Sequence, residues 1–285
     1  MKKTILVIGA TGNLSRDIVV EAASKGFNVK AATRHPEKYQ APAANVQAVK
    51  FEFETPETFD NALKDVDVVS LVALPLDATA PQKLRAFIEA VKAKGINRLA
   101  FTSAIGVNLN EEAPLRKVER LIYDAGIPYS ILRPNFFMEN FSRGFIAGMI
   151  QHTGGFALAA EDAKTSFIST KDIAKAVVQT LLDEKHKNKE FTLTGSSSID
   201  HQQAAEILSK VSGKTIRYQA ITEEQMIEGS VAAGLPQSEA DYLGVLYSAV
   251  RAGYTENPTP DLEQITGEKG TSFEEFAKAN AEVWK

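Results

Sequence analysis

The chain has 285 residues and a net charge of −4, which argues against a nucleic-acid-binding surface because such surfaces carry an excess of Lys and Arg. It contains no cysteine, which excludes disulfides, thiolate catalysis and cysteine-ligated metal and is compatible with a cytoplasmic location. Its longest apolar stretch, residues 68–76, is too short to cross a bilayer, so no membrane span is expected.

The first residues predict a strand, a glycine-rich turn and a helix. Apolar residues 5–8 lead directly into Gly9, which permits a tight turn, and Gly12 leaves room beside the backbone. Such a unit directs free backbone N–H groups and the positive end of a helix dipole to one point, where a pyrophosphate fits. Ser15 stands where the usual dinucleotide-binding fingerprint has a third glycine, so the match is incomplete.

Apolar segments alternate with amphipathic helical patterns through the first half of the chain. Because helices separate these segments, the strands cannot pair as hairpins, and a parallel sheet with right-handed crossovers is expected. The ligand crevice then lies at the carboxyl ends of the strands, where the strand order reverses. The expected strands are 4–8, 28–33, 46–51, 66–74, 98–102 and 129–133, and three helices are expected to end at Gly26, Gly95 and Gly126.

After residue 155 the pattern changes to short strands, expected at 165–168, 190–194 and 216–220, and to helices that begin with capping boxes at Asp200, Thr222 and Ser272. We therefore expect two domains. Residues 1–155 form a dinucleotide-binding domain, on which a helix at 170–184 packs. Residues 156–285 form a smaller α+β substrate-binding lobe, in which residues 254–270 are an exposed irregular loop.

The end of the second expected strand predicts which cofactor is bound. A carboxylate at this place would favour NAD, but the chain has Arg34 there and Lys38 shortly after it. A guanidinium can form paired hydrogen bonds with a 2′-phosphate, and a nearby lysine adds positive charge. We predict NADP(H) binding in preference to NAD(H); the alternative is that both side chains simply solvate a loop.

The loop Gly9-Ala-Thr-Gly12-Asn-Leu resembles that of the extended and atypical short-chain dehydrogenases/reductases, and most closely their NmrA-like branch. That branch includes NAD(P)H-dependent quinone and dye reductases and redox-sensing regulators. Residues 51–59, 126–134 and 168–176 are similar to later segments of the same branch, in the same order. The resemblance implies a Rossmann fold, a doubly wound parallel α/β sheet.

The resemblance also implies a set of cofactor-binding residues. Glu52 and Phe53 are expected near the adenine, although Phe53 equally suits core packing. Ala73 and Leu74 are expected near the ribose and phosphates, and Ser103 and Pro134 on the nicotinamide side. The pyrophosphate is expected to contact the glycine-rich turn, at Gly9, Thr11, Gly12, Asn13 and Leu14.

The superfamily's usual Tyr-x-x-x-Lys pair, which handles the proton in carbonyl chemistry, is absent: Glu111 and Leu115 occupy those positions. A quinone-like or other planar electrophile needs no such donor, since its reduced product takes a proton from solvent. We therefore expect an NADPH-dependent oxidoreductase that transfers hydride directly to such a small-molecule substrate, with no metal and no flavin. Lys117 is a candidate for polarising the acceptor; the alternative is that it is a solvated residue on the surface of a helix.

Phe136 and Phe137 follow the sixth expected strand and are the candidate substrate-stacking residues. Phe137, Phe141 and Phe145 recur at helical spacing, so pure packing is the alternative. The four histidines show no metal-ligand spacing; His35 is placed to assist the phosphate site, and the others are expected at the surface. The alternative function is a non-catalytic NADP(H)-binding redox sensor that acts through a protein partner, and a homodimer is left open.

Overall fold

A computed structural model describes residues 2–74 and 76–285. The chain divides into two compact units, the first built from residues up to Pro134 with Lys171–Thr192, and the second from Asn135–Thr170 with Leu193–Lys285. This division differs from the boundary expected after residue 155. Residues 135–155 belong to the second unit because their apolar side chains, such as Met138 and Ile150, are buried in that unit's core.

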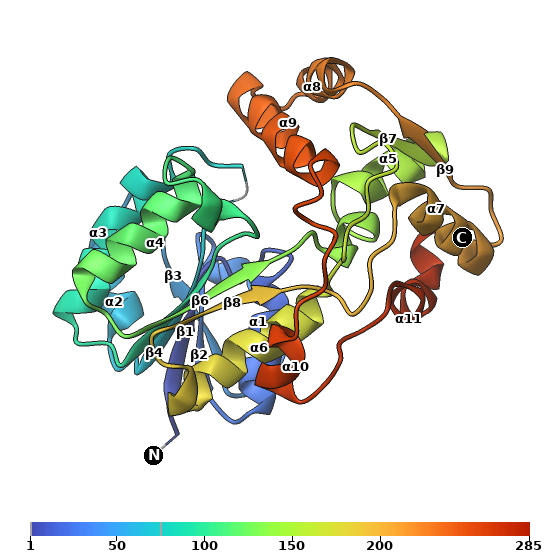
Figure 1. Cartoon of the computed structure of the whole chain (residues 1–285). Coiled ribbons are helices and arrows are strands. Elements are labelled where there is room, and N and C mark those ends of the chain that lie inside the picture. Colours follow the sequence, from blue (N-terminus) through green and yellow to red (C-terminus); the bar gives the residue numbers. More distant parts are fainter. Residues whose placement is uncertain (1, 75) are drawn as a thin grey trace. The chain divides into compact units, whose positions relative to one another are not determined.

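The first unit contains a doubly wound sheet, in which seven strands of the described residues are ordered β3-β2-β1-β4-β5-β6-β8 (Figure 1). The pairings of β1 with β2 and β4, of β2 with β3, and of β5 with β4 and β6 are all parallel. The strand order reverses beside β1, which confirms the expected α/β fold class. The strands are β1 (Thr4–Val7), β2 (Asn28–Thr33), β3 (Val46–Lys50), β4 (Val68–Val72), β5 (Arg98–Thr102), β6 (Tyr129–Pro134) and β8 (Lys189–Leu193).

Helices cover both faces of this sheet. Helices α2, α3 and α4 bury apolar side chains such as Phe59, Phe87 and Ile122 against one face, and α1 and α6 lie on the other (Figure 1). Gly26, Gly95 and Gly126 have left-handed φ values of 86°, 63° and 70° just past three helices, as expected. The helices are α1 (Ser15–Ser24), α2 (Glu57–Leu63), α3 (Ala80–Ala93), α4 (Pro114–Ala125) and α6 (Thr170–Leu182), with short 3₁₀ turns η1 (Pro36–Lys38), η2 (Val107–Leu109) and η4 (Glu184–His186).

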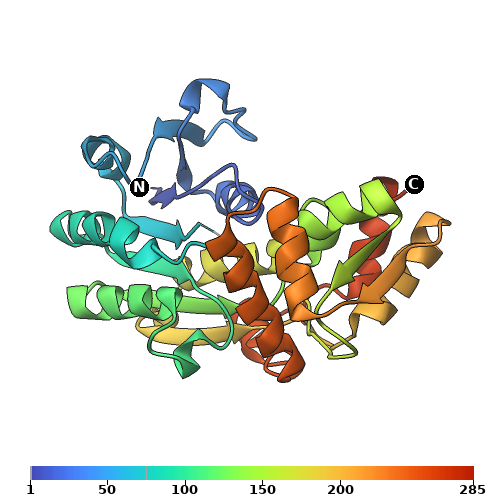
Figure 2. The same ribbon diagram turned by 90° about the horizontal axis from the view of Figure 1, so that it is seen from above.

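The second unit packs helices and a short parallel sheet, β7 (Gly155–Leu158) with β9 (Arg217–Ala220), around an aromatic core. Helices α8 and α9 lie side by side in both views (Figures 1 and 2). The remaining elements are η3 (Met138–Phe141), α5 (Phe145–Thr153), α7 (His201–Ser212), α8 (Glu223–Ala232), α9 (Gln237–Arg251), α10 (Asp261–Thr266), α11 (Phe273–Ala279) and η5 (Ala281–Val283).

In the second half of the chain, the predicted helix starts are confirmed, but the predicted strands do not all pair as expected. The three capping boxes are confirmed. Residues 165–168 form only isolated bridges, whereas the strand expected at 190–194 is β8 and lies in the large sheet. The segment expected to be irregular contains α10. Strand β7 was missed because Gly155 signals a turn in sequence, while here it lets two strands approach: a Cβ would meet the Arg217 carbonyl.

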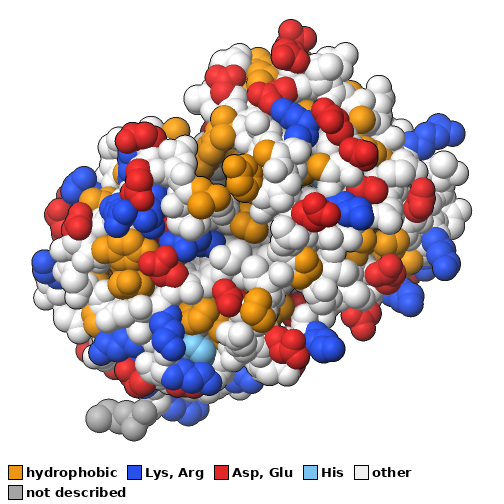
Figure 3. Space-filling model, in the orientation of Figure 1, with side chains coloured by type: hydrophobic (Ala, Val, Ile, Leu, Met, Phe, Trp, Pro, Cys, Tyr) orange, Lys and Arg blue, Asp and Glu red, His pale blue; other side chains and the backbone are white. Residues whose placement is uncertain are grey.

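No helix within the described residues combines the length and apolarity that a membrane span requires. On the face drawn in Figure 3, acidic and basic side chains are interspersed.

Candidate functional site

The glycine-rich turn after β1 needs its two glycines for different reasons. Gly9 has a φ of 65°, in the left-handed region that disfavours other residues. The Gly12 amide donates to the Gly9 carbonyl at 2.8 Å, and a Cβ on Gly12 would lie only 3.2 Å from that carbonyl oxygen. A side chain at position 12 would therefore crowd the turn itself as well as anything bound against it.

Ser15 occupies the position of the third glycine of the fingerprint and packs α1 closely against β1. Its buried hydroxyl donates to the Ile8 carbonyl at 2.8 Å, so the first residue of α1 is tied to the end of β1. A small side chain at this position still lets helix and strand approach closely, which is the task of the missing glycine.

Backbone donors gather where the turn enters α1. Among the described residues, the amides of Thr11, Leu14 and Ser15 donate to no backbone carbonyl, unlike those of Gly12 and Arg16. Thr11 and Gly12 are exposed, Asn13 is half-buried, and the Leu14 side chain anchors the turn in the core. Free amides at the positive end of a helix dipole suit a phosphate group, so this turn fits a dinucleotide pyrophosphate.

The carboxyl end of β2 presents an available guanidinium. Arg34 follows the last residue of β2 and is exposed, and its side chain pairs with no other described residue. Lys38, in η1, is exposed as well. The predicted phosphate-binding side chains therefore lie free at the strand end where a cofactor's ribose is held in this fold.

The neighbouring end of β3 holds an ion pair. The Glu52 carboxylate lies 2.5 Å from Lys50 Nζ and accepts a long bond of 3.4 Å from the Thr55 hydroxyl. The hydrogen bond from Lys50 lowers the pKa of Glu52, and the Arg34 charge adds to this. Lys50 was not predicted as a site residue, because only the parallel register of β2 and β3 brings it to this point.

Phe53 is half-buried and packs edge-on against Phe51 and Phe87, with ring centroids 5.0 and 6.0 Å apart. These contacts favour the core-packing alternative for its ring. Its role beside the adenine stays a prediction.

The other expected cofactor residues follow β4, β5 and β6. Ala73 is half-buried and Leu74 is 52% exposed. Ser103 is buried, and within the described part of the chain its hydroxyl has no hydrogen-bond partner. Buried hydroxyls are usually paired, so this one is an available donor at the carboxyl end of β5. Pro134 is the buried last residue of β6.

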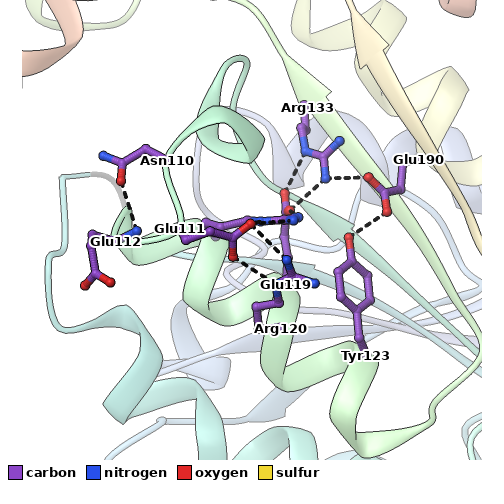
Figure 4. Close-up of polar contacts among 9 residues, drawn as sticks. Asn110, Glu111, Glu112, Glu119, Arg120, Tyr123, Arg133 and Glu190 are labelled. Atoms are coloured by element: carbon purple, nitrogen blue, oxygen red, sulfur yellow. Dashed lines mark hydrogen bonds and ion pairs between the residues drawn. The ribbon is translucent and has the colours of Figure 1, made fainter.

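Glu111, at the position of the missing tyrosine, is held by arginines just before α4 (Figure 4). Its carboxylate accepts bonds of 2.9–3.0 Å from Arg120 and Arg116. These bonds lower the pKa of Glu111 to about 2. An ionised carboxylate has no proton to donate at neutral pH, so this residue does not replace the tyrosine as an acid. Leu115 packs against the core.

The same cluster continues into the interior as a chain of buried ion pairs (Figure 4). Glu119 is fully buried and lies between Arg116, at 2.8 Å, and Arg133, at 2.7 Å. Arg133 also contacts Glu190 at 2.6 Å, and the Tyr123 hydroxyl donates to Glu190 at 2.8 Å. Burial and this bond raise the pKa of Tyr123. The Tyr123 hydroxyl proton is thus already donated in a hydrogen bond to Glu190.

Lys117, the candidate acceptor-polarising residue, lies on α4 with 47% of its side chain exposed and pairs with Glu112 at 2.6 Å. It lines an open hollow with Arg85 and Asp124. The ion pair favours the surface reading, and the proposed role in polarising an acceptor stays a prediction.

The candidate substrate residues lie in the second unit. Phe136 and Phe137 are half-buried, and the Phe136 ring lies 5.6 Å from that of Tyr247. The predicted helical stripe is not formed, because Phe137 precedes η3 while Phe145 begins α5, beyond a break at Gly144. Phe141 is fully buried, in agreement with packing.

The expectation that the later histidines lie at the surface is wrong for two of them. His186 and His201 are 4% and 1% exposed. His201 lies among aromatic rings, 5.4 Å from Phe167, and burial lowers its pKa to about 4. The capping box at Asp200 locates the start of α7, but it does not show whether the first helical residue, His201, is buried or exposed. No group of His, Cys, Asp and Glu within the described residues is arranged to hold a metal.

A doubly wound sheet, a glycine turn with free amides and a basic end of β2 together define an α/β dinucleotide-binding protein. Comparison with known families agrees: the model of the NmrA-like family matches residues 1–277. The chain belongs to the NmrA-like family.

Individual relatives match along nearly the whole chain. Prestalk A differentiation protein A of Dictyostelium discoideum is 33% identical over 281 residues, covering 97% of this chain and 92% of the relative. The NAD(P)H azoreductase of Xenophilus azovorans is 30% identical, covering 97% and 98%. The structure of the NADPH-dependent quinone oxidoreductase QOR2 of Escherichia coli, complexed with NADPH, matches with a TM-score of 0.83 and 26% identity over 97% and 98% of the two chains.

Proposed function

We propose that this protein is an NAD(P)H-dependent oxidoreductase that prefers NADP(H) and reduces a quinone-like or other planar electrophile by direct hydride transfer. The observation that carries the cofactor preference is the exposed Arg34 guanidinium beyond β2, which has no partner among the described residues. The azoreductase and the quinone oxidoreductase among the relatives support the class of reaction.

Bound NADPH would supply the hydride, and the chain's own residues would hold and orient it. The free amides of the glycine turn would bind the pyrophosphate, and Arg34 with Lys38 would bind the 2′-phosphate. The buried Ser103 hydroxyl, which has no hydrogen-bond partner in the described part of the chain, would contact the nicotinamide side. Positioning of hydride donor and acceptor is then the main source of catalysis.

Two side chains near the lost motif are unsuited to donate a proton. Glu111 is ionised, and the Tyr123 hydroxyl is bonded to Glu190. This supports an acceptor whose reduced form takes its proton from solvent, as a quinone or a dye does. Phe136 and Phe137 are the candidate rings for stacking such a planar molecule.

Titration of NADPH and NADH into wild type and Arg34→Ala tests the cofactor preference. We expect the variant to bind NADPH about tenfold to a hundredfold more weakly, since a charged hydrogen-bond partner is lost, and to bind NADH nearly unchanged. Arg85→Ala is the matched control, because Arg85 is also an exposed arginine with no partner among the described residues. Equal wild-type affinities for the two cofactors, or an unchanged Arg34 variant, would contradict the preference.

NADPH oxidation in the presence of quinones and azo dyes tests the reaction. Turnover that survives in Tyr123→Phe supports a donor-free mechanism, and loss of turnover in a folded Tyr123→Phe variant contradicts it. Lys117→Met, measured beside it, decides whether Lys117 contributes to kcat.

A second candidate is a non-catalytic sensor of the NADP(H) redox state that acts through a protein partner. It is favoured by the 33% identity to a relative that is named for differentiation rather than for a reaction. Similar affinities for NADP⁺ and NADPH, without turnover of any acceptor in the screen, would support this candidate over the enzyme.

A further inference from the structure

Three charged residues, Arg34, Lys50 and Glu52, lie where β2 and β3 end. Lys50, the last residue of β3, is in register with Thr33, the last residue of β2. Its Nζ atom donates to the Arg34 carbonyl at 2.8 Å and lies 2.5 Å from Glu52 Oε1. Lys50 thus joins the backbone of the phosphate-binding candidate to the neighbouring carboxylate.

Without Lys50, the Glu52 carboxylate would oppose a 2′-phosphate. The Glu52 side chain is 30% exposed, and the Arg34 charge lies close enough to lower the pKa of Glu52. A phosphate group carries about −1.5 to −2 charges near pH 7, so a bare carboxylate beside it repels it. The same carboxylate is an alternative partner for the Arg34 guanidinium. The ion pair with Lys50 counters the charge of this carboxylate, and the Arg34 guanidinium has no partner among the described residues.

We propose that Lys50 determines cofactor specificity: by neutralising Glu52 and holding the Arg34 carbonyl, it keeps the Arg34 guanidinium available for a 2′-phosphate. Lys50 acts through Arg34 and Glu52 and is therefore a positioning residue. The inference rests on the proposed binding of NADP(H).

A double-mutant cycle on binding tests this without any turnover. The dissociation constants of NADPH and NADH are measured by calorimetry for wild type, Lys50→Met, Glu52→Gln and the double variant. The ratio of the two constants isolates the 2′-phosphate, because any effect on the adenine or the pyrophosphate is common to both cofactors. We expect Lys50→Met to lower the preference for NADPH about tenfold, as for a lost charge partner, and Glu52→Gln in that background to restore most of it.

The matched control is Lys94→Met, which removes an exposed lysine paired with a carboxylate, Asp60, at 2.8 Å elsewhere in the first unit. It should leave the cofactor ratio unchanged, and circular dichroism should show all variants folded. An unchanged ratio in Lys50→Met overturns the proposal. An equal loss on removing Lys50 from wild type and from the Glu52→Gln variant overturns it as well, because the effect would then not pass through the carboxylate.

Failure of this inference is distinguishable from failure of the proposed function. If Arg34→Ala lowers the preference for NADPH and Lys50→Met does not, only the role of Lys50 is wrong. If wild type binds neither cofactor, the proposed function itself fails.

Discussion

The two units each bury a cluster of polar side chains, and they do so in opposite ways. In the first unit, the fully buried Glu119 carboxylate lies between two arginines, and Arg133 has a second carboxylate partner in Glu190. In the second, His201 and the Tyr247 hydroxyl lie among aromatic rings, with no hydrogen-bond partner within the described part of the chain.

This difference determines what each cluster is sensitive to. Buried ions are tolerated only while every partner is present, because a lone charge in the interior is not compensated by water. A neutral imidazole or phenol needs no counter-ion, but burial disfavours its charged form and so shifts its pKa away from the value in the unfolded chain. The first cluster should therefore respond most strongly to mutation, and the second to pH.

Replacing Glu119 with alanine should have the largest effect on stability. The change leaves Arg116 and Arg133 without their shared buried carboxylate, and breaking a buried pair in this way costs about 3–5 kcal/mol. Urea unfolding of the whole chain, monitored by circular dichroism, measures the loss.

Glu112→Ala is the control. It removes the nearby ion pair between Glu112 and Lys117, in which the Glu112 side chain is 84% exposed. Exposed pairs contribute about 0–1 kcal/mol, so this variant should unfold almost as wild type does. If the two variants proved equally stable, the buried network would not have the importance that its geometry implies.

The sequence predicted the elements of the first unit well because apolar strands and glycine helix stops are local signals, as are the capping boxes of the second unit. The glycine turn and Arg34 were likewise readable, since backbone conformation and strand ends fix their places. Strand pairing was not local: β8 lies beside β6 although more than fifty residues separate them. The division into units depends on packing in the same way, because η3 and α5, which precede the boundary predicted after residue 155, have their apolar side chains in the core of the second unit.

The missed site residues show the same limit at the level of side chains. Lys50 has no motif of its own and meets Arg34 only through the register of two strands. His201 follows a capping aspartate, a position that indicates a helix start but not a buried one. Glu111 is predicted at the position of the motif's tyrosine, but the sequence does not show that Arg116 and Arg120, on the next turns of α4, donate to its carboxylate and lower its pKa.

Acidification should destabilise the chain through His201. Burial lowers its pKa from 6.5 to about 4, so between these values the unfolded state binds a proton that the folded state does not. This contribution to stability is complete above pH 6.5 and is lost as the pH falls to 4, to a total of about 3 kcal/mol at 1.36 kcal/mol per pKa unit.

The measurement is the difference in unfolding free energy between wild type and His201→Phe from pH 7 to pH 4, because all other titrating groups cancel in it. His152→Phe, at an exposed histidine, is the control for replacing an imidazole by a phenyl ring. A difference that stays constant across this pH range would mean that His201 is protonated in the folded state or is already accessible to water.

The smallest effect is expected at Tyr247, and its sign is the informative part. Its hydroxyl is buried without a partner among the described residues, whereas its ring packs 5.6 Å from Phe136 and 6.1 Å from His201. Tyr247→Phe keeps the ring and removes a desolvated hydroxyl, so we expect stability to be unchanged or raised by about 1 kcal/mol. Tyr218→Phe is the matched control, because the Tyr218 hydroxyl donates to the Glu161 carbonyl at 3.0 Å and its loss should cost about 1 kcal/mol. Urea unfolding should therefore separate the two variants, with Tyr218→Phe the less stable. Destabilisation of both by the same amount would show that the Tyr247 hydroxyl is hydrogen-bonded in solution.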